Sequence, residues 1–340
     1  MLVSDIPALR DYWYAVARSD QVTERPIDAR LFGEDYVVWR ADGGVHAAPA
    51  ACPHRGAALA QGWVVDGCLV CPYHGWRYDA SGACVLIPAS TPDVPIPPRA
   101  RLRTLPADER YGLVWVCAGT PRAPIPELPE AEDPAYTVVH ELIEEWHASA
   151  PRVTDNALDV SHVAWVHRAS VGDPDSPRLG EFTVERDGER LRFSVTIQSR
   201  VKGQQVANTG LEGVVRRTTH AELVQPFVFR GVLEYENGLR HVLYKTAAPV
   251  DDRTTLFCQS VARNDSPDEA RQAGIIAVDR QVQDEDRRLL ERIDPDFPLD
   301  TTAEVHTRAD RMTIEYRRIL ADLAAAGRAP LGVERERQPA

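Results

Sequence analysis

The sequence predicts an α+β protein of two domains: a small all-β domain, then a larger domain in which helices flank a central antiparallel sheet. The length of 340 residues favours two domains, because single hydrophobic cores rarely grow beyond about 250–300 residues. A stretch with five prolines at 118–134 separates the two halves. Beyond it, residues 180–262 alternate between apolar and polar side chains, which is the period of a strand with one buried face. We therefore expect domains at 1–120 and 136–327, joined by a proline-rich linker at 121–135.

Short apolar runs in the first domain are expected to be strands that lead into tight loops. Val37–Trp39 precedes one loop, and Leu69–Val70 runs directly into a second loop. An apolar run at 111–117 is expected to be the strand that closes the domain. A further proline-rich run at 87–98 is expected to be a loop within it.

The second domain is expected to begin with a strand at 136–139. Its alternating runs are expected to be strands at 182–186, 191–197, 227–235, 241–245 and 255–258. A helix is expected to start at Ser266, because serine is a good N-cap and Pro267 suits the first helical position. The last helix is expected to cover 303–326. The tail at 328–340 is rich in Arg, Glu and Pro, and we expect it to be disordered.

The most informative motif provides one cysteine and one histidine on each of two loops. It reads C-x-H, then sixteen residues, then C-x-x-H, and its candidate ligands are Cys52, His54, Cys71 and His74. Two thiolates and two imidazoles suit a [2Fe–2S] cluster of the Rieske type, in which two histidines replace two cysteines on one iron. The alternative is a zinc site. Zinc sites usually open with C-x₂₋₄-C and keep their histidines together, so the spacing favours the cluster.

A second motif places acidic and imidazole side chains on a predicted helix around residue 160. Asn156, Asp159 and His162 share one helical face, and a carboxylate one turn before His162 can hydrogen-bond an imidazole, although the spacing alone leaves open which one. His167 lies five residues beyond His162, about 140° further around an ideal helix. Both histidines can bind one metal only if the helix is distorted or ends between them, for example near Trp165. The alternative is a surface helix with two unrelated histidines.

Two histidines need a carboxylate to complete a two-His-one-carboxylate iron site. The expected helix at 281–293 carries three acids in a row. Asp286 shares its stripe with apolar side chains, namely Val282, Leu289, Leu290 and Ile293, whereas Asp284 lies on the solvated face. A buried acid must be paired or bound to metal, so Asp286 is the predicted third ligand. Asp284 is the second choice, and an Asp286 paired with an arginine is the alternative.

The runs CPHRGAALAQG and CPYHGWRYDASG resemble the Rieske domain of the Rieske non-haem iron oxygenases over about the first third of the chain. The second motif is similar to that family's N-x-x-D-x-x-H-x₃₋₄-H segment, and EDRRLLE is similar to its acidic-pair segment. The resemblance implies that His162, His167 and Asp286 bind a mononuclear Fe(II). It also implies that Asp159 bridges His74 of a neighbouring subunit to His162 and carries electrons between subunits.

The overall pattern looks most similar to the three-fold symmetric, single-component oxygenases, such as the vanillate and dicamba O-demethylases. This implies a homotrimer that uses O₂ to hydroxylate, or oxidatively demethylate, a small cyclic or aromatic compound. Electrons from NAD(P)H are expected to arrive through a separate reductase, with or without a ferredoxin. cis-Dihydroxylation is the alternative within the class. A Rieske electron carrier without substrate turnover is the alternative of another class.

The composition argues against other partners. A net charge of −12 is unsuited to nucleic acids and gives no basic patch for anionic membranes. No membrane span and no signal peptide are recognisable, so we expect a cytoplasmic protein. The cysteines outside the cluster motif are expected to be small buried hydrophobes; they are Cys68, Cys84, Cys117 and Cys258. His140 and His147 are expected to be ordinary residues, and Trp76 to pack over the cluster.

Overall fold

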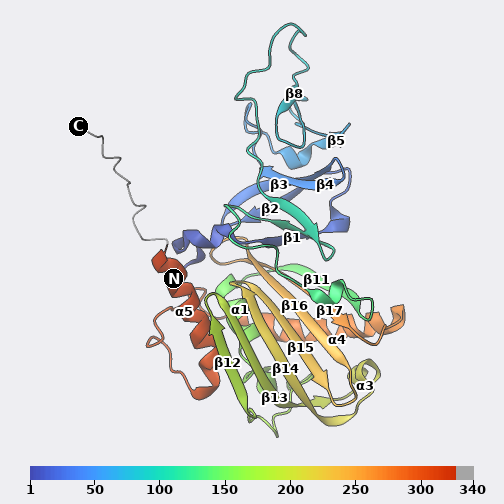
Figure 1. Cartoon of the computed structure of the whole chain (residues 1–340), viewed down its shortest axis with the longest axis vertical. Coiled ribbons are helices and arrows are strands. Elements are labelled where there is room, and N and C mark those ends of the chain that lie inside the picture. Colours follow the sequence, from blue (N-terminus) through green and yellow to red (C-terminus); the bar gives the residue numbers. More distant parts are fainter. Residues whose placement is uncertain (327–340) are drawn as a thin grey trace, which may run out of the picture.

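The structure is a computed structural model and describes residues 1–326, so the tail predicted at 328–340 lies outside the described residues. Figure 1 shows an elongated molecule with small sheets towards one end and one large sheet with helices at the other. The predicted α+β class is confirmed. No helix within 1–326 is both long and apolar enough to cross a membrane.

The N-terminal part consists of three small sheets, ordered β1-β10-β9, β2-β3-β4 and β5-β6-β7-β8. Their strands are β1 Tyr14–Arg18, β2 Ile27–Leu31, β3 Glu34–Ala41, β4 Gly44–Pro49, β5 Trp63–Val65, β6 Cys68–Val70, β7 Arg77–Tyr78, β8 Cys84–Leu86, β9 Ala107–Arg110 and β10 Leu113–Val116. Strand β3 precedes the first loop as expected, but a strand that was not predicted, β4, lies between them, because the chain first reverses at Gly43. The short run Ala47–Ala48 gave β4 too weak an apolar signal to be recognised.

The segment between β10 and β11 is irregular apart from one short turn at Pro129–Ala131. It nevertheless lies against the rest of the molecule through three hydrogen bonds to its backbone carbonyls. Nε1 of Trp13 donates to the carbonyl of residue 123, Nε2 of Gln225 to that of 124, and the Tyr244 hydroxyl to that of 126, over 2.8–2.9 Å. The side chains of Ile125 and Leu128 are also buried. The segment is therefore attached along its length.

The second part is built on a seven-stranded antiparallel sheet, ordered β11-β17-β16-β15-β14-β13-β12. Its strands are β11 Thr137–Trp146, β12 Phe182–Asp187, β13 Arg190–Val201, β14 Gly213–Gln225, β15 Val228–Tyr235, β16 Arg240–Pro249 and β17 Thr255–Arg263. Strand β14 was not singled out by its sequence, since Arg216, Arg217, Thr218 and Thr219 interrupt the alternation. It lies between β13 and β15 and contributes to the wall of the pocket described below.

Helices pack against this sheet and position the second motif. They are α1 Ala150–Leu158, α2 Val163–Val166, α3 Gln204–Thr209, α4 Glu269–Leu290 and α5 Arg311–Ala326. Helix α1 contacts β15 and β16, and α4 contacts β11, α1 and α3 (Figure 1). Helix α5 buries Met312, Tyr316, Ile319, Leu320 and Leu323, an i, i+4, i+7 stripe.

Two helix starts were predicted wrongly. Helix α4 begins after Asp268, whose side chain caps it by accepting from the backbone N of Arg271 over 2.9 Å. Ser266 has a φ of +42° and is not the N-cap. The last helix begins at Arg311 rather than at Ala303, because the chain before it forms turns and a short 3₁₀ segment.

Candidate metal centres

The two loops that carry the Cys/His motif have the same backbone geometry. The N of Gly56 donates to the carbonyl of Cys52 over 2.8 Å, and the N of Gly75 donates to the carbonyl of Cys71 over 3.0 Å. Each cysteine N also donates to a carbonyl five residues later, over 2.9 Å. Both glycines have φ near +70°, a region that only glycine enters readily. The sequence thus builds two equivalent loops that face each other.

The four candidate ligands are arranged as an inner cysteine pair and an outer histidine pair. Cys52 and Cys71 are 3% and 1% exposed, whereas His54 is half-buried and His74 is exposed. The two imidazole rings lie 4.5 Å apart between centroids. Nδ1 of His54 is buried without a hydrogen-bond partner, which suits an atom that binds a metal.

These four donors do not converge on one point, as a single zinc ion would require. Within residues 1–326, the one group of three or more His, Cys, Asp or Glu donors that meet closely is the second motif. Two separate pairs, one of sulfur and one of nitrogen, fit a [2Fe–2S] cluster with one all-Cys iron and one all-His iron. Trp76 stacks on His54 at 4.4 Å and 8°, so its ring covers the histidine side of the site.

The second motif is not one continuous helix. Helix α1 ends at Leu158, Asp159 has extended backbone, and the chain turns before the single turn of α2. His162 precedes α2 and His167 follows it. The expectation that Asn156, Asp159 and His162 share a helical face is therefore wrong, since the helix ends before Asp159. The predicted helix end between the two histidines is found at Val166.

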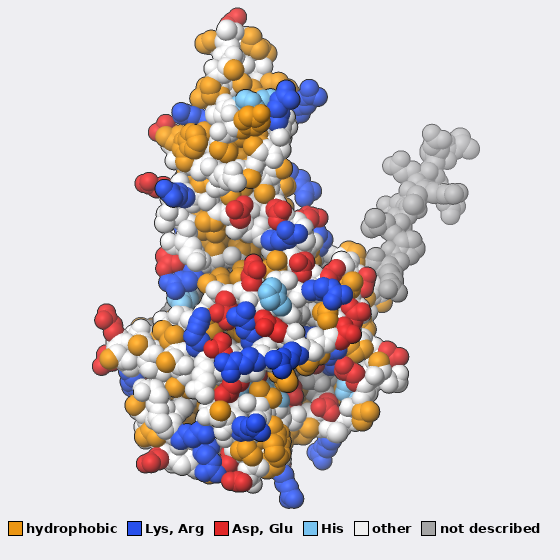
Figure 2. Space-filling view, turned by 180° about the vertical axis from the view of Figure 1, so that it is seen from behind, with side chains coloured by type: hydrophobic (Ala, Val, Ile, Leu, Met, Phe, Trp, Pro, Cys, Tyr) orange, Lys and Arg blue, Asp and Glu red, His pale blue; other side chains and the backbone are white. Residues whose placement is uncertain are grey.

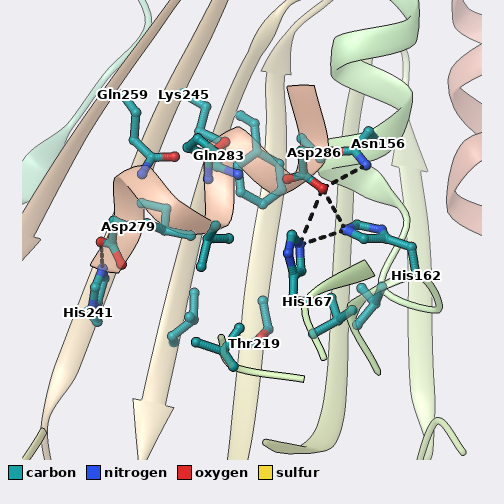
Figure 3. A pocket seen from close by; sticks show the side chains of 18 of the residues that line it. Asn156, His162, His167, Thr219, His241, Lys245, Gln259, Asp279, Gln283 and Asp286 are labelled. Carbon is teal, nitrogen blue, oxygen red and sulfur yellow. Dashed lines mark hydrogen bonds and ion pairs between the residues drawn. The ribbon is translucent and has the colours of Figure 1, made fainter. Parts of the chain in front are cut away.

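This interruption brings three donor atoms together. Nε2 of His162 lies 3.2 Å from Nε2 of His167, and Oδ1 of Asp286 lies 3.5 and 3.3 Å from these two atoms. Figure 3 shows the three side chains pointing at one another from the α1–α2 segment and from α4. The three residues can hold one metal ion, and two histidines with one carboxylate are the donors of non-haem Fe(II).

Two of the three donors have a hydrogen-bonded partner, and the third, His162, lies near a carboxylate. Oδ2 of Asp159 lies 3.6 Å from Nδ1 of His162, and Glu285 Oε2 lies 2.9 Å from Nδ1 of His167. The Asn156 amide donates to Oδ1 of Asp286 over 3.3 Å. Glu285 was missed by the sequence reasoning, which left it on the boundary between the buried and solvated faces of its helix. A carboxylate next to the predicted ligand was the available signal.

The charges in the site complement one another. Burial disfavours the ionised form of Asp286, yet His167 and His162 lower the pKa of its carboxyl below the ordinary value. Burial also disfavours a charged His162, yet Asp159 and Asp286 raise the pKa of its imidazole. Two carboxylates therefore favour positive charge at the place where the three donors meet, as a cation site requires.

The buried face of α4, on which the prediction of Asp286 was based, differs in part from the expected one. Leu289 and Ile293 are exposed, at 45% and 39%, and the buried face of α4 carries Asp279, Gln283 and Asp286. Asp284 makes no contact with either histidine in the described part of the chain, so the group contains Asp286.

A pocket of about 120 Å³ adjoins these donors, close to the roughly 150 Å³ cavity that holds benzene in an engineered protein. Apolar side chains from α1, from α2 and the segments beside it, from α4 and from the large sheet form much of its wall; they are Ala157, Val160, Val163, Val171, Phe193, Phe229, Leu233, Leu243 and Val282. Polar residues line the rest, among them Arg217, Thr219, Lys245, Gln259 and Gln283. A small ring compound therefore fits beside the candidate metal site.

The remaining candidates lie outside both centres. Nδ1 of His140 hydrogen-bonds Ser260 across 2.9 Å, and the backbone N of His147 donates to Glu291. No two cysteines form a disulfide within residues 1–326. Three of the four outside the cluster motif are buried, and Cys68 is half-buried.

Comparisons with known proteins cover both parts of the chain. The model of the Rieske [2Fe-2S] domain matches residues 12–106, and the model of the vanillate O-demethylase oxygenase C-terminal domain matches residues 146–326. The methylxanthine N1-demethylase NdmA of Pseudomonas putida is 32% identical over 328 residues, covering 94% of this chain and 90% of the relative. The methylxanthine N3-demethylase NdmB of the same organism is 30% identical, covering 93% and 90%.

Solved structures agree. Pseudomonas putida NdmA with caffeine superimposes with a TM-score of 0.82 at 30% identity, over 95% of this chain and 93% of that one. Dicamba monooxygenase bound to dicamba shares the fold, with a TM-score of 0.81 at 23% identity over 94% and 98%. Matches of this length to both parts show that the chain belongs to the Rieske non-haem iron oxygenases, enzymes that use a [2Fe–2S] cluster and a mononuclear iron to oxidise small organic compounds with O₂.

Proposed function

We propose that this chain is the oxygenase component of a monooxygenase that hydroxylates a methyl group on a small cyclic compound, after which the carbon leaves as formaldehyde. The observation that carries the proposal is the meeting of His162, His167 and Asp286 at the wall of a ring-sized pocket. N- and O-demethylases among the relatives support the same outcome.

In this proposal, Cys52, Cys71, His54 and His74 hold the [2Fe–2S] cluster, and His162, His167 and Asp286 hold Fe(II). When bound, the cluster supplies single electrons and the iron supplies O₂ activation. The protein contributes the ligand geometry, the apolar wall that limits water, and the orientation of the substrate. Asn156 and Glu285 keep the carboxylate and one imidazole in place.

The overall reaction needs reducing equivalents from outside the chain. A methyl group on nitrogen or oxygen reacts with O₂, two electrons and two protons to give the demethylated compound, formaldehyde and water. A separate reductase delivers the electrons. We propose that they originate from NAD(P)H and arrive with or without a ferredoxin.

We further propose that the chain acts as a homotrimer in which Asp159 accepts a hydrogen bond from His74 of the neighbouring subunit and passes electrons towards His162. Exposure supports this arrangement. The ring of Tyr73, next to His74, is 63% exposed, and Trp63 is 48% exposed. Figure 2 shows hydrophobic side chains gathered on the narrow cluster-bearing end, whereas acidic and basic side chains are interspersed over the broad end. Asp159 itself is 28% exposed at its side chain.

The experiment is to measure iron and acid-labile sulfide on anaerobically purified protein, with an EPR spectrum of the reduced state. About three irons and two sulfides per chain with a Rieske signal are expected. O₂ uptake and formaldehyde release are then followed with N-methyl and O-methyl ring compounds. Two irons and two sulfides, with no third iron after Fe(II) is added, would indicate an electron carrier. A diol product without formaldehyde would indicate cis-dihydroxylation.

A further inference from the structure

Two cationic side chains line the pocket without a partner. The side chain of Lys245 on β16 makes no hydrogen bond and no ion pair with any residue in 1–326, and the same holds for the side chain of Arg217 on β14. Nε of Arg217 is buried and unpartnered. Burying a polar group without a partner costs free energy. The position of these two cations in the pocket therefore requires an explanation.

The acidic side chains of the pocket are already engaged. Asp286 faces the two histidines, Asp159 accepts from Ser161 and lies near His162, and Asp279 lies 3.1 Å from Nε2 of His241. None of these carboxylates lies within ion-pair distance of Lys245 or Arg217 in the described chain.

Glu141, behind the pocket, does not supply the missing charge. Nε2 of Gln259 donates to its Oε2 over 2.6 Å. Burial, and then the neighbouring Asp279, raise the pKa of Glu141 well above its ordinary value, which disfavours the charged form of this side chain. Burial lowers the pKa of Lys245 and Arg217 lowers it further, although Asp286, Asp279 and Glu141 oppose this shift.

We propose that the substrate is an anionic ring compound, and that its carboxylate pairs with Lys245 and Arg217. This inference rests on the proposed function, because it concerns the substrate of the same pocket. Figure 3 shows Lys245, Gln259 and Gln283 on the side of the pocket away from His162 and His167. A ring held by its carboxylate at Lys245 therefore presents another edge to the metal site.

The chemistry of the two cations fits a carboxylate. Arginine offers a planar fork of donors that matches two carboxylate oxygens, and lysine offers a point charge. The amide of Gln283, which is 3% exposed and lines the pocket, adds neutral hydrogen-bonding capacity. Because the whole chain carries a net charge of −12, a preference for anions must come from such local cations.

The test compares 2-, 3- and 4-methoxybenzoate with the three matching methoxybenzamides, which have the same shape without the charge. Binding to iron-loaded protein is measured by calorimetry at constant ionic strength. Wild-type protein is expected to bind at least one benzoate roughly ten- to a hundredfold more tightly than its amide, the range of one charged hydrogen bond. Lys245→Met and Arg217→Gln should each reduce this ratio by about tenfold.

Arg216→Gln is the matched control, because Arg216 is adjacent on β14 but points to the exposed face, and it should leave the ratio unchanged. Lys245→Gln provides a second variant should methionine prevent folding. The inference is overturned if iron-loaded wild-type protein binds the amides as tightly as the benzoates, if it binds no benzoate at millimolar concentration, or if both lysine variants keep the ratio. A failure of the proposed function would give a different result. In that case the protein would lack mononuclear iron, or it would consume no O₂ with any methylated ring compound.

Discussion

Glu285 Oε2 lies 2.9 Å from Nδ1 of His167, on the side of the ring opposite the nitrogen that faces Asp286. The same Glu285 oxygen accepts a hydrogen bond from the hydroxyl of Ser170 over 2.6 Å. The carboxylate therefore fixes which His167 nitrogen is free to bind a metal, and it is itself held in place.

Replacing this carboxylate is expected to weaken mononuclear iron binding without affecting the cluster. Glu285→Gln should reduce iron affinity by about 10- to 100-fold, the usual effect of losing a partner to a metal-binding histidine. The measurement is iron retention against a chelator series, with the Rieske EPR signal as internal control. Unchanged retention would show that the Glu285 contact is dispensable.

The choice between neighbouring acids can be tested with a matched pair. Asp286→Ala should abolish the mononuclear iron and turnover while two irons and two sulfides remain in the cluster, because a two-histidine site lacks its carboxylate. Asp284→Ala should keep all three irons, since Asp284 lies outside the donor group. Loss of iron in the Asp284 variant would reverse the assignment.

The proposed role of Asp159 as an electron bridge between subunits predicts a variant that retains both metal centres but turns over slowly. Asp159→Asn keeps a side chain of the same size near Nδ1 of His162 but removes its charge. Both metal centres should remain, and turnover should fall at least about tenfold. The diagnostic measurement is the single-turnover rate of cluster oxidation with substrate and O₂. A wild-type rate would exclude the bridge role.

The raised pKa of Glu141 predicts a pH-dependent difference in stability. The pKa of this buried carboxyl is raised above 4.5 in the folded protein. The protonated carboxyl therefore makes its full contribution to stability below pH 4.5, and this contribution is lost as the pH rises towards the pKa of the folded state. Glu141→Gln removes this titration. The variant should match wild type near pH 5 and gain relative stability towards pH 8, by up to about 1.4 kcal/mol per pH unit. Thermal unfolding of both proteins at the two pH values measures this, and a constant difference would refute it.

The ion pairs between α1 and α5 should make a large contribution to stability. Arg317 is 2% exposed and lies 2.7 Å from both Asp155 and Glu304. Arg317→Leu leaves Asp155, whose side chain is 19% exposed, without this cation and should cost about 3 kcal/mol. Arg318→Leu, which removes an exposed partner of Glu315, should cost less than about 1 kcal/mol. Equal losses in denaturant unfolding would contradict the argument.

Much of the fold and of the site could be predicted because the signals were local. Alternation marked most strands of the large sheet, and the spacing of Cys52, His54, Cys71 and His74 indicated the cluster chemistry. What failed depended on contacts between distant segments. The sequence from Asn156 to His162 has a helical pattern, but the chain turns after Leu158, and the hydrogen bonds from Ser161 to Asp159 belong to that turn. Strand β14 has little alternation, and its place is set by pairing with β13 and β15.

The enclosure of Lys245 and Arg217 in the pocket could not be predicted for a related reason. Both residues stand in strands where a polar side chain reads as solvent-facing, and only the stacking of α1 and α4 over the sheet encloses them. Asp286 was selected by a stripe that included two exposed residues, Leu289 and Ile293. Asp286 was nevertheless the residue selected, because a buried acid requires a partner whether or not its neighbours on the stripe are buried.

The segment after β10 has a consequence for how electrons travel. Trp13 just before β1, Gln225 on β14 and Tyr244 on β16 donate to its carbonyls at 123, 124 and 126, which restrains it between the cluster loops and α4. This restraint disfavours a hinge motion that would bring the two metal centres of one chain together. In the proposed trimer, association is a condition for turnover rather than a source of stability, and dilution into monomers would stop catalysis while leaving both metal centres loaded.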